Sequence, residues 1–177
     1  MNKIALAATM ALLCLLLAFP LPAAAAQTVK VLKVSDGDTL MVLSGGKKVR
    51  LRVLGIDTPE THPGQHAQSQ AKRLGMSEAR VISWGKKARH RVARLIGRGG
   101  KVSLESDSKQ PRRDRYGRML AHVRLADGRL LSAVLVREGL AEVYRRFNVT
   151  HKRELLRLEA QARAERAGIW SQARPRR

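Results

Sequence analysis

Several residue types that mark particular protein classes are scarce in this 177-residue sequence. Its one cysteine, Cys14, lies in an apolar N-terminal stretch, which excludes a scaffold held together by disulfide bonds. Aromatic residues make up only 3% of the chain, which argues against a single-strand binder built from stacked aromatic platforms. The sequence shows no internal repeat and no long linker. The roughly 150 residues after the N-terminal stretch suit one compact domain with one core.

Acidic residues are also scarce. The chain has 14 Asp and Glu against 35 Lys and Arg, which gives a formal net charge of +21. A solvated surface with balanced charges does not carry so large an excess. The charge therefore predicts a polyanionic partner, which could be nucleic acid, anionic lipid or acidic polysaccharide.

The N-terminal segment has the pattern of a secretory signal peptide. Lys3 precedes an uncharged apolar run that Pro20 interrupts, and the small residues 23–26 follow. We therefore predict cleavage after Ala26 and a secreted or periplasmic protein with no stable membrane association. The alternative is an uncleaved anchor, but the run before Pro20 is short for a bilayer span of about 20 residues. The predicted division of the chain is a signal peptide at 1–26, a domain at 27–171 and a basic, disordered tail at 172–177.

Hydrophobic periodicity predicts a small β-rich domain. Five strands are predicted, at residues 28–34, 38–43, 48–56, 101–105 and 118–125. Short turns join the first three, which predicts an antiparallel meander. An amphipathic helix is predicted over 83–96, and the polar segment 61–76 is predicted to be a loop that can include a helical turn.

Two further helices are predicted near the C-terminus. Ser132 can cap a short helix that Gly139 ends. The last helix starts within 148–150 and ends at Gly168, after which 169–170 fold back as an apolar contact. The predicted fold class is α+β, mainly β barrel: a five-stranded OB-fold barrel with three helices.

Acidic residues gather early in this basic chain. V-S-D-G-D-T contains Asp36 and Asp38, and D-T-P-E contains Asp57 and Glu60. If the second and third strands pair, their ends bring Asp38 and Asp57 together into an oxygen-rich pocket. Hard cations such as Ca²⁺ prefer such a pocket. The alternative is that D-G-D is an ordinary turn and that D-T-P is a capped strand exit.

Two arginines favour the first interpretation. Guanidinium groups bind phosphate oxygens, so Arg52 and Arg118 could stabilise the charge that a phosphodiester gains when water attacks it. Glu60 could orient or deprotonate that water. However, Arg52 lies five residues before Asp57, and strict alternation places the two on opposite faces unless the strand bends near Gly55.

Five motifs occur in an order that resembles the staphylococcal nuclease (thermonuclease) family. They are V-S-D-G-D-T, L-R-V-L-G-I-D-T-P-E, D-R-Y-G-R, L-V-R-E-G-L-A and G-I-W-S, and they extend over residues 29–171. The resemblance implies an OB-fold barrel and a Ca²⁺-dependent phosphodiesterase that cleaves DNA and RNA with little sequence specificity. It also implies 3′-phosphate products, and we expect a monomer.

The resemblance also implies roles for individual residues. The metal ligands would be Asp38, Asp57 and the backbone carbonyl of Thr58. The catalytic residues would be Arg52, Glu60 and Arg118. The substrate-binding residues would be Tyr116, Arg115 and Tyr144. Asp36 would be an acid near the metal without being a direct ligand.

The sequence departs from the family's pattern in two places. Tyr144 is slightly out of register with the family's nucleotide-binding tyrosines, and Arg145 occupies a neighbouring position. The segment after Glu60 is longer than in the family's prototype, and its His62 and His66 are predicted to lie on the surface.

Two other functions remain possible from the sequence. A non-catalytic nucleic-acid-binding OB-fold module would respond mainly to salt, whereas the enzyme would need Ca²⁺. All five acid and arginine positions are present, which favours the enzyme. A cationic membrane-active protein would explain the charge but not the acidic cluster.

Overall fold

The computed structural model describes residues 27–172. The predicted signal peptide at 1–26 lies outside the described residues. So does the predicted tail at 172–177, except for Gln172, which ends the last helical turn. Among residues 27–172, no helix is both long and apolar enough to cross a membrane.

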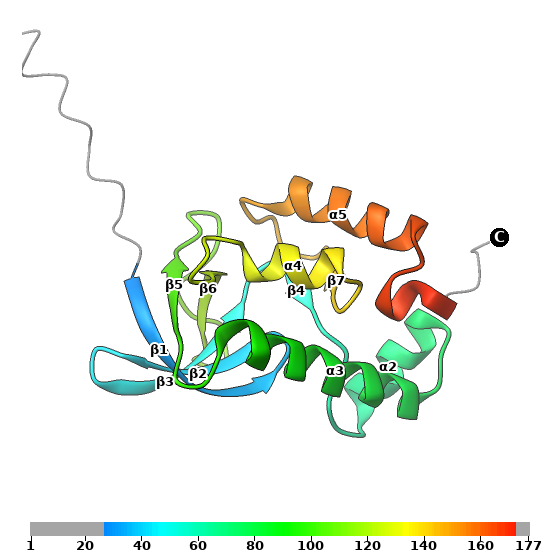
Figure 1. Cartoon of the computed structure of the whole chain (residues 1–177), viewed down its shortest axis with the longest axis horizontal. Coiled ribbons are helices and arrows are strands. Elements are labelled where there is room, and N and C mark those ends of the chain that lie inside the picture. Colours follow the sequence, from blue (N-terminus) through cyan, green and yellow to red (C-terminus); the bar gives the residue numbers. More distant parts are fainter. Residues whose placement is uncertain (1–26, 173–177) are drawn as a thin grey trace, which may run out of the picture.

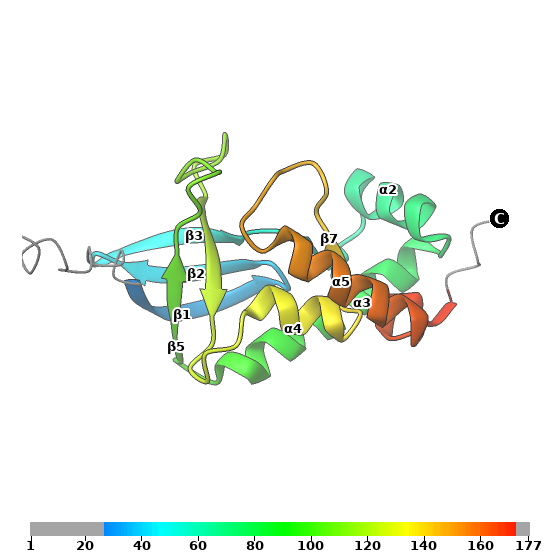
Figure 2. The ribbon, with the colours of Figure 1, turned by 90° about the horizontal axis from the view of Figure 1, so that it is seen from above.

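Five strands form a closed barrel (Figures 1 and 2). They are β1 (Gln27–Asp36), β2 (Thr39–Ser44), β3 (Lys47–Val53), β5 (Lys101–Glu105) and β6 (Met119–Arg124). The order around the barrel is β1-β2-β3-β6-β5, with β3 and β6 parallel and the other pairs antiparallel. Every second residue points inward, as in the pairs Leu40 and Val42 or Leu51 and Val53, and these side chains fill the barrel. The predicted α+β barrel is confirmed.

The predicted third strand is two strands in the structure. β3 ends at Val53, and the separate β4 (Ile56–Asp57) pairs with β7 (Glu142–Val143) outside the barrel. Gly55 between them has φ of 84°, a conformation that side-chain-bearing residues rarely adopt. The bend at Gly55 sends Asp57 off the barrel sheet, so strict alternation no longer separates it from Arg52.

Residues 27–172 contain four α-helices, so the predicted number of three for this domain is wrong. They are α2 (Gln65–Leu74), α3 (Glu78–Ile96), α4 (Leu131–Arg137) and α5 (Lys152–Ala164), and the 3₁₀ turn η1 (Gly168–Gln172) follows. Figure 2 shows α2 at the end of the molecule opposite the outer turn of β2 and β3.

The additional helix is α2, which replaces the loop predicted for 61–76. Its buried residues are Ala67, Gln70, Ala71 and Leu74, which follow helical spacing. Three of the four are small or polar, so the hydrophobic signal in the sequence is weak. α3 begins at Glu78, earlier than predicted, because the Ser77 side chain caps it by accepting the Arg80 N–H at 3.4 Å.

The last two helices differ from the prediction at their starts. Ser132 is buried inside α4 and makes no cap hydrogen bond, so its predicted role is wrong. α5 begins at Lys152, later than expected. The predicted apolar contact at its end is confirmed, since Ile169 is 1% and Trp170 3% exposed.

A buried polar network joins the barrel to the start of α5. Asp107, just after β5, accepts hydrogen bonds from Thr150 N at 2.7 Å, Thr150 Oγ1 at 3.0 Å and Lys109 N at 2.9 Å. Its Oδ2 also lies 2.9 Å from His122 Nε2 on β6. Burial alone would raise the pKa of Asp107, but these hydrogen bonds hold it well below the ordinary value of 3.8.

Asp107→Ala is expected to lower the free energy of unfolding at pH 7 by about 3 kcal/mol, because it removes the partner of the buried His122 ring and of two part-buried backbone N–H groups. Chemical denaturation measures this change. The control is Asp127→Ala, which removes an exposed carboxylate paired with Arg129 and should leave the free energy of unfolding nearly unchanged. Equal effects of the two substitutions would contradict a structural role for the network.

The same network gives a pH dependence with a defined sign. The folded pKa of Asp107 is lowered, so its stabilisation is present above about pH 4 and is lost as the pH falls through the folded value. Burial also lowers the pKa of His122 from 6.5, so protons bind the unfolded chain first and stability decreases as the pH falls below 6.5.

Candidate active site

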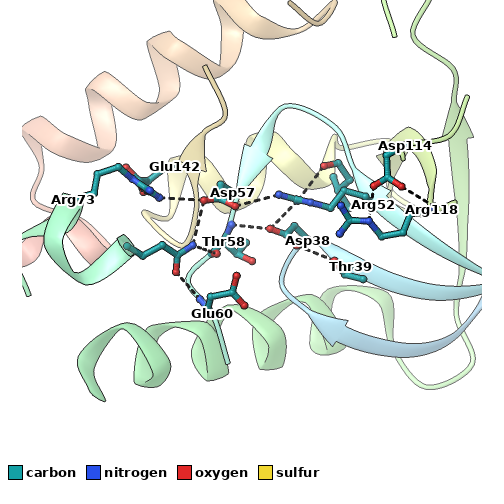
Figure 3. Close-up of polar contacts among 12 residues, drawn as sticks. Asp38, Thr39, Arg52, Asp57, Thr58, Glu60, Arg73, Asp114, Arg118 and Glu142 are labelled. Carbon is teal, nitrogen blue, oxygen red and sulfur yellow. Dashed lines mark hydrogen bonds and ion pairs between the residues drawn. The ribbon is translucent and has the colours of Figure 1, made fainter. Parts of the chain in front are cut away.

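One guanidinium group bridges two carboxylates at the edge of the barrel where β1 and β3 end and β2 begins. β2 and β3 pair with Thr39 opposite Arg52, which places Arg52 beside the β1–β2 turn. Arg52 Nη1 lies 2.7 Å from Asp38 Oδ2, and Nη2 lies 3.2 Å from Asp57 Oδ1 (Figure 3). The structure thus brings Asp38 and Asp57 together, as predicted for the strand ends. It adds Arg52, which strict strand alternation placed on the face opposite Asp57.

Asp38 is fixed by its neighbours. It is 6% exposed, and its carboxylate accepts the Thr58 N–H at 2.8 Å and the Thr39 hydroxyl at 3.1 Å. Its backbone carbonyl accepts the Val53 N–H at 2.8 Å. Gly37 allows this close approach, because a Cβ there would lie 2.7 Å from the Thr58 side chain. The motifs D-G-D-T and D-T-P-E are therefore packed directly against each other.

Asp36 and Glu60 add two further acids around this pair. Asp36 accepts a hydrogen bond from the Thr61 hydroxyl, so its carboxylate is engaged away from Arg52. Burial is the main cause that raises the pKa of Glu60, and the negative charges of Asp38, Asp36 and Asp57 raise it further. A carboxylate with a raised pKa is a stronger proton acceptor than an ordinary glutamate.

α3 supports the backbone of the D-T-P-E motif. A Cβ on Gly85 would lie 2.2 Å from the Glu60 carbonyl oxygen and 2.5 Å from that of Pro59, so only glycine allows the helix to pass there. His62 and His66, in the segment before α3, are both exposed, as predicted.

Arg118, the residue just before β6, lies beside Arg52 (Figure 3). The parallel pairing of β3 and β6 sets Met119 opposite Leu51, and Figure 3 shows Arg118 beside Arg52. Arg118 Nε donates to Asp114 Oδ2 at 2.6 Å, and neither Nη atom has a hydrogen-bond partner among the described residues. The two Nη groups are therefore available to phosphate oxygens.

Tyr116 and Arg115 form an exposed unit next to Arg118. Tyr116 is 60% exposed, and Arg115 Nη2 donates to its hydroxyl at 2.6 Å. The guanidinium carbon of Arg118 lies 5.5 Å from the Tyr116 ring centre. This arrangement can present an aromatic face and cations to a bound nucleotide.

Tyr144 lies next to β4, and within residues 27–172 its side chain makes no hydrogen bond or ring contact with the acids and arginines of the site. It follows β7, and its N–H donates to the Gly55 carbonyl at 2.9 Å, next to β4. Its ring lies 5.3 Å from that of Phe147. Arg145 forms an ion pair with Glu159 of α5, so its guanidinium is already engaged within the protein.

Two residues near the site were missed by the sequence analysis. Gln70 and Arg73 of α2 contact Asp57, and Gln70 also contacts Thr58 and Glu60. The sequence pattern predicts a loop here, which gives no helix face that relates these side chains to the site. A signal was present in the sequence: Ala67, Gln70, Ala71 and Leu74 have the spacing of one helix face, and Arg73 lies beside that face.

The donor set suits a hard cation. Asp38 and Asp57 converge on one positive group, Arg52, which shows that both carboxylates can face a single cation. The Thr58 carbonyl is a further oxygen donor of the same motif, held by Gln70 Nε2 at 2.9 Å, and oxygen donors are those that Ca²⁺ prefers. Within residues 27–172, no cluster of three or more His, Cys, Asp or Glu side chains is arranged to hold a metal. A bound ion would therefore depend on two carboxylates, the carbonyl and water.

Comparisons with known proteins agree with this geometry. Residues 50–172 match the family described as staphylococcal nuclease homologue. The thermonuclease of Staphylococcus hyicus is 35% identical over 147 residues, which cover 82% of this chain and 76% of that protein. Endonuclease YncB of Bacillus subtilis is 36% identical over 140 residues, covering 78% of this chain and 59% of that protein. An uncharacterized endonuclease of Escherichia coli O157:H7 is 30% identical over 148 residues, covering 82% and 78%. The chain belongs to the staphylococcal nuclease family and is a nuclease.

Proposed function

We propose that this nuclease is Ca²⁺-dependent, that it hydrolyses DNA and RNA with little sequence specificity, and that it leaves 3′-phosphate ends. The observation that carries the proposal is the convergence of Asp38 and Asp57 on one guanidinium, with Arg118 alongside. Asp38, Asp57 and the Thr58 carbonyl would hold the ion. When bound there, Ca²⁺ supplies positive charge close to the scissile phosphate.

The protein's own groups would then divide the remaining work. Arg118 binds phosphate oxygens through its two Nη groups while Asp114 holds Nε. Arg52 adds a second guanidinium, so charge that develops on the phosphoryl oxygens is stabilised from two sides. Glu60, with its raised pKa, orients the attacking water and accepts its proton.

Broad specificity follows from what these groups recognise. Arginines and a metal ion bind phosphates, which carry no sequence information, and Tyr116 offers a ring face that accepts any base. The net charge of +21 favours binding to polyanions, and we expect salt to weaken this binding strongly. All the side chains of the cluster come from one chain, so we also propose that a monomer is active.

Analysis of product ends tests the cleavage chemistry. Denatured DNA and RNA labelled at the 5′ end would be digested briefly, and the fragments would then be treated with a 3′-phosphatase. The expected result is that phosphatase slows the migration of fragments from both substrates, since removing a 3′-phosphate removes charge. Fragments that a polymerase extends without phosphatase treatment would carry 3′-hydroxyl ends and would contradict the proposal.

Secretion or periplasmic export is proposed from the sequence of residues 1–26. Mass spectrometry of the intact protein recovered outside the cytoplasm tests both export and cleavage. The expected chain begins at Gln27, and a cytoplasmic protein that retains Met1 would contradict export.

A further inference from the structure

α2 contacts the D-T-P-E motif with two side chains of neighbouring turns. Gln70 and Arg73 are three residues apart, so both lie on the side of the helix that faces β4. Elsewhere on this side, Ala67 and Ala71 pack with Val81 of α3, and Leu74 packs with Ile169 and Trp170. The helix is therefore anchored by apolar contacts independent of its polar ones.

Gln70 uses both ends of its carboxamide. Its Nε2 donates to the Thr58 carbonyl at 2.9 Å and to Asp57 Oδ2 at 3.2 Å, and its Oε1 accepts the Glu60 N–H at 2.8 Å. The side chain is 5% exposed. Two acceptors on one side and a donor on the other determine the orientation of the amide. One buried side chain thus contacts three of the residues to which the proposed function assigns roles.

Arg73 forms ion pairs with two neighbouring carboxylates, Asp57 and Glu142. β4 and β7 pair with Asp57 directly opposite Glu142, and carboxylates in such positions repel each other. Arg73 Nη2 lies 3.1 Å from Asp57 Oδ2 and 2.6 Å from Glu142 Oε2, and Nε donates to Glu142 at 2.9 Å. Figure 3 shows Arg73 reaching Asp57 from the side opposite Arg52.

The two oxygens of Asp57 consequently face different partners. Oδ2 accepts from Gln70 and Arg73, both on α2, whereas Oδ1 faces Arg52 and, through it, Asp38. The contacts from α2 hold the carboxylate in one rotation, with Oδ1 turned toward the Asp38 side. They also hold the Thr58 carbonyl and the Glu60 backbone.

We propose that α2 is a positioning element of the active site and that Gln70 and Arg73 are its positioning residues. They set the direction of the Asp57 carboxylate, the Thr58 carbonyl and the Glu60 backbone before substrate binds. The inference rests on the proposed function for the roles of Asp57, Thr58 and Glu60. The contacts themselves do not depend on those roles.

The test compares Gln70→Met with Gln68→Met. Methionine has nearly the length of glutamine but neither the donor nor the acceptor, and Gln68 is exposed on the same helix. Substitution of a residue that hydrogen-bonds to a metal ligand typically lowers metal affinity or enzyme activity by about 10–100-fold. In Gln70→Met, we expect the Glu60 amide to exchange hydrogen about tenfold faster, Ca²⁺ affinity to fall about tenfold, and kcat on denatured DNA to fall about 10–100-fold. Gln68→Met should change none of these.

Gln70→Glu separates the two ends of the side chain. A carboxylate can still accept the Glu60 N–H, but it cannot donate to Thr58 or Asp57. We expect slow exchange of the Glu60 amide to return while kcat stays low. A merely structural role would move thermal stability and kcat together in both variants.

Two outcomes would overturn the inference. One is an unchanged rate of exchange at Glu60 in Gln70→Met, measured by NMR without Ca²⁺ or substrate. The other is faster exchange there with wild-type kcat and Ca²⁺ affinity. Both leave the proposed function intact. Failure of the proposed function would appear separately, as a wild-type protein that needs no Ca²⁺, and the exchange measurement would still decide whether Gln70 holds Glu60.

Discussion

Arg118→Ala is expected to lower kcat on denatured DNA by about 10²–10³-fold, the usual cost of removing one donor that stabilises charge in a transition state. The fold should be retained, because the Arg118 side chain makes one part-buried ion pair, with Asp114, and the other Asp114 oxygen keeps its hydrogen bonds from the backbone N–H groups of residues 116 and 118. Initial rates at saturating Ca²⁺, together with thermal unfolding, measure both effects.

Arg129→Ala is the matched control for this substitution. Arg129 also pairs with an aspartate nearby in sequence, Asp127, but it lies in the turn after β6, away from the site. Its loss should leave kcat unchanged. Arg118→Lys should restore only part of the activity, since lysine keeps the charge but loses the planar fork of donors. Wild-type turnover in Arg118→Ala would remove Arg118 from the mechanism.

Asp38→Asn is expected to reduce Ca²⁺-dependent cleavage by about 10²-fold or more. Loss of a carboxylate ligand weakens an interaction worth several kcal/mol, and each 1.4 kcal/mol corresponds to about a factor of ten. Asparagine keeps an oxygen that can accept the Thr58 N–H, so the packing of the two motifs should persist. Asp38→Ala should be at least as inactive, with a further loss of stability because that N–H is then buried without a partner.

Asp36→Asn is the comparison that isolates the metal role. Asp36 lies in the same motif, but its carboxylate is bonded to the Thr61 hydroxyl. We expect a small change in kcat and an unchanged Ca²⁺ requirement in this variant. An Asp38→Asn protein that cleaves normally at low Ca²⁺ would show that Asp38 is not a ligand.

The sequence predicted that Asp38 and Asp57 converge, because both flank predicted strands that pair with each other. Alternating apolar residues predict β2 and β3, and the pairing of those strands brings Asp38 to Arg52. Asp57 joins them from β4, beyond the bend at Gly55. The strand alternation between Arg52 and Asp57 was a real conflict. The positive φ of Gly55 resolves it, and a glycine in a strand pattern is a recognised signal for such a bend.

The rest depended on tertiary contacts that local patterns do not contain. α2 was missed because its buried face is made of Ala67, Ala71 and a glutamine, and only Leu74 is large and apolar. The contacts of Gln70 with the Thr58 carbonyl and the Glu60 N–H depend on the folded chain and cannot be predicted from the local sequence. Similarly, serine is a residue type that often caps helices, but Ser132 is buried inside α4 because the helix starts one residue before it.

Cleavage of denatured DNA by the purified mature chain, in Ca²⁺ and in excess EGTA, tests most directly whether Asp38 and Asp57 hold a catalytic ion among arginines. The predicted result is complete degradation in Ca²⁺ and intact DNA in EGTA, with activity restored when Ca²⁺ is added back. Degradation at equal rates in both conditions would contradict a catalytic Ca²⁺. DNA that is retarded on a gel but intact in both would mean that the acids and arginines serve binding alone.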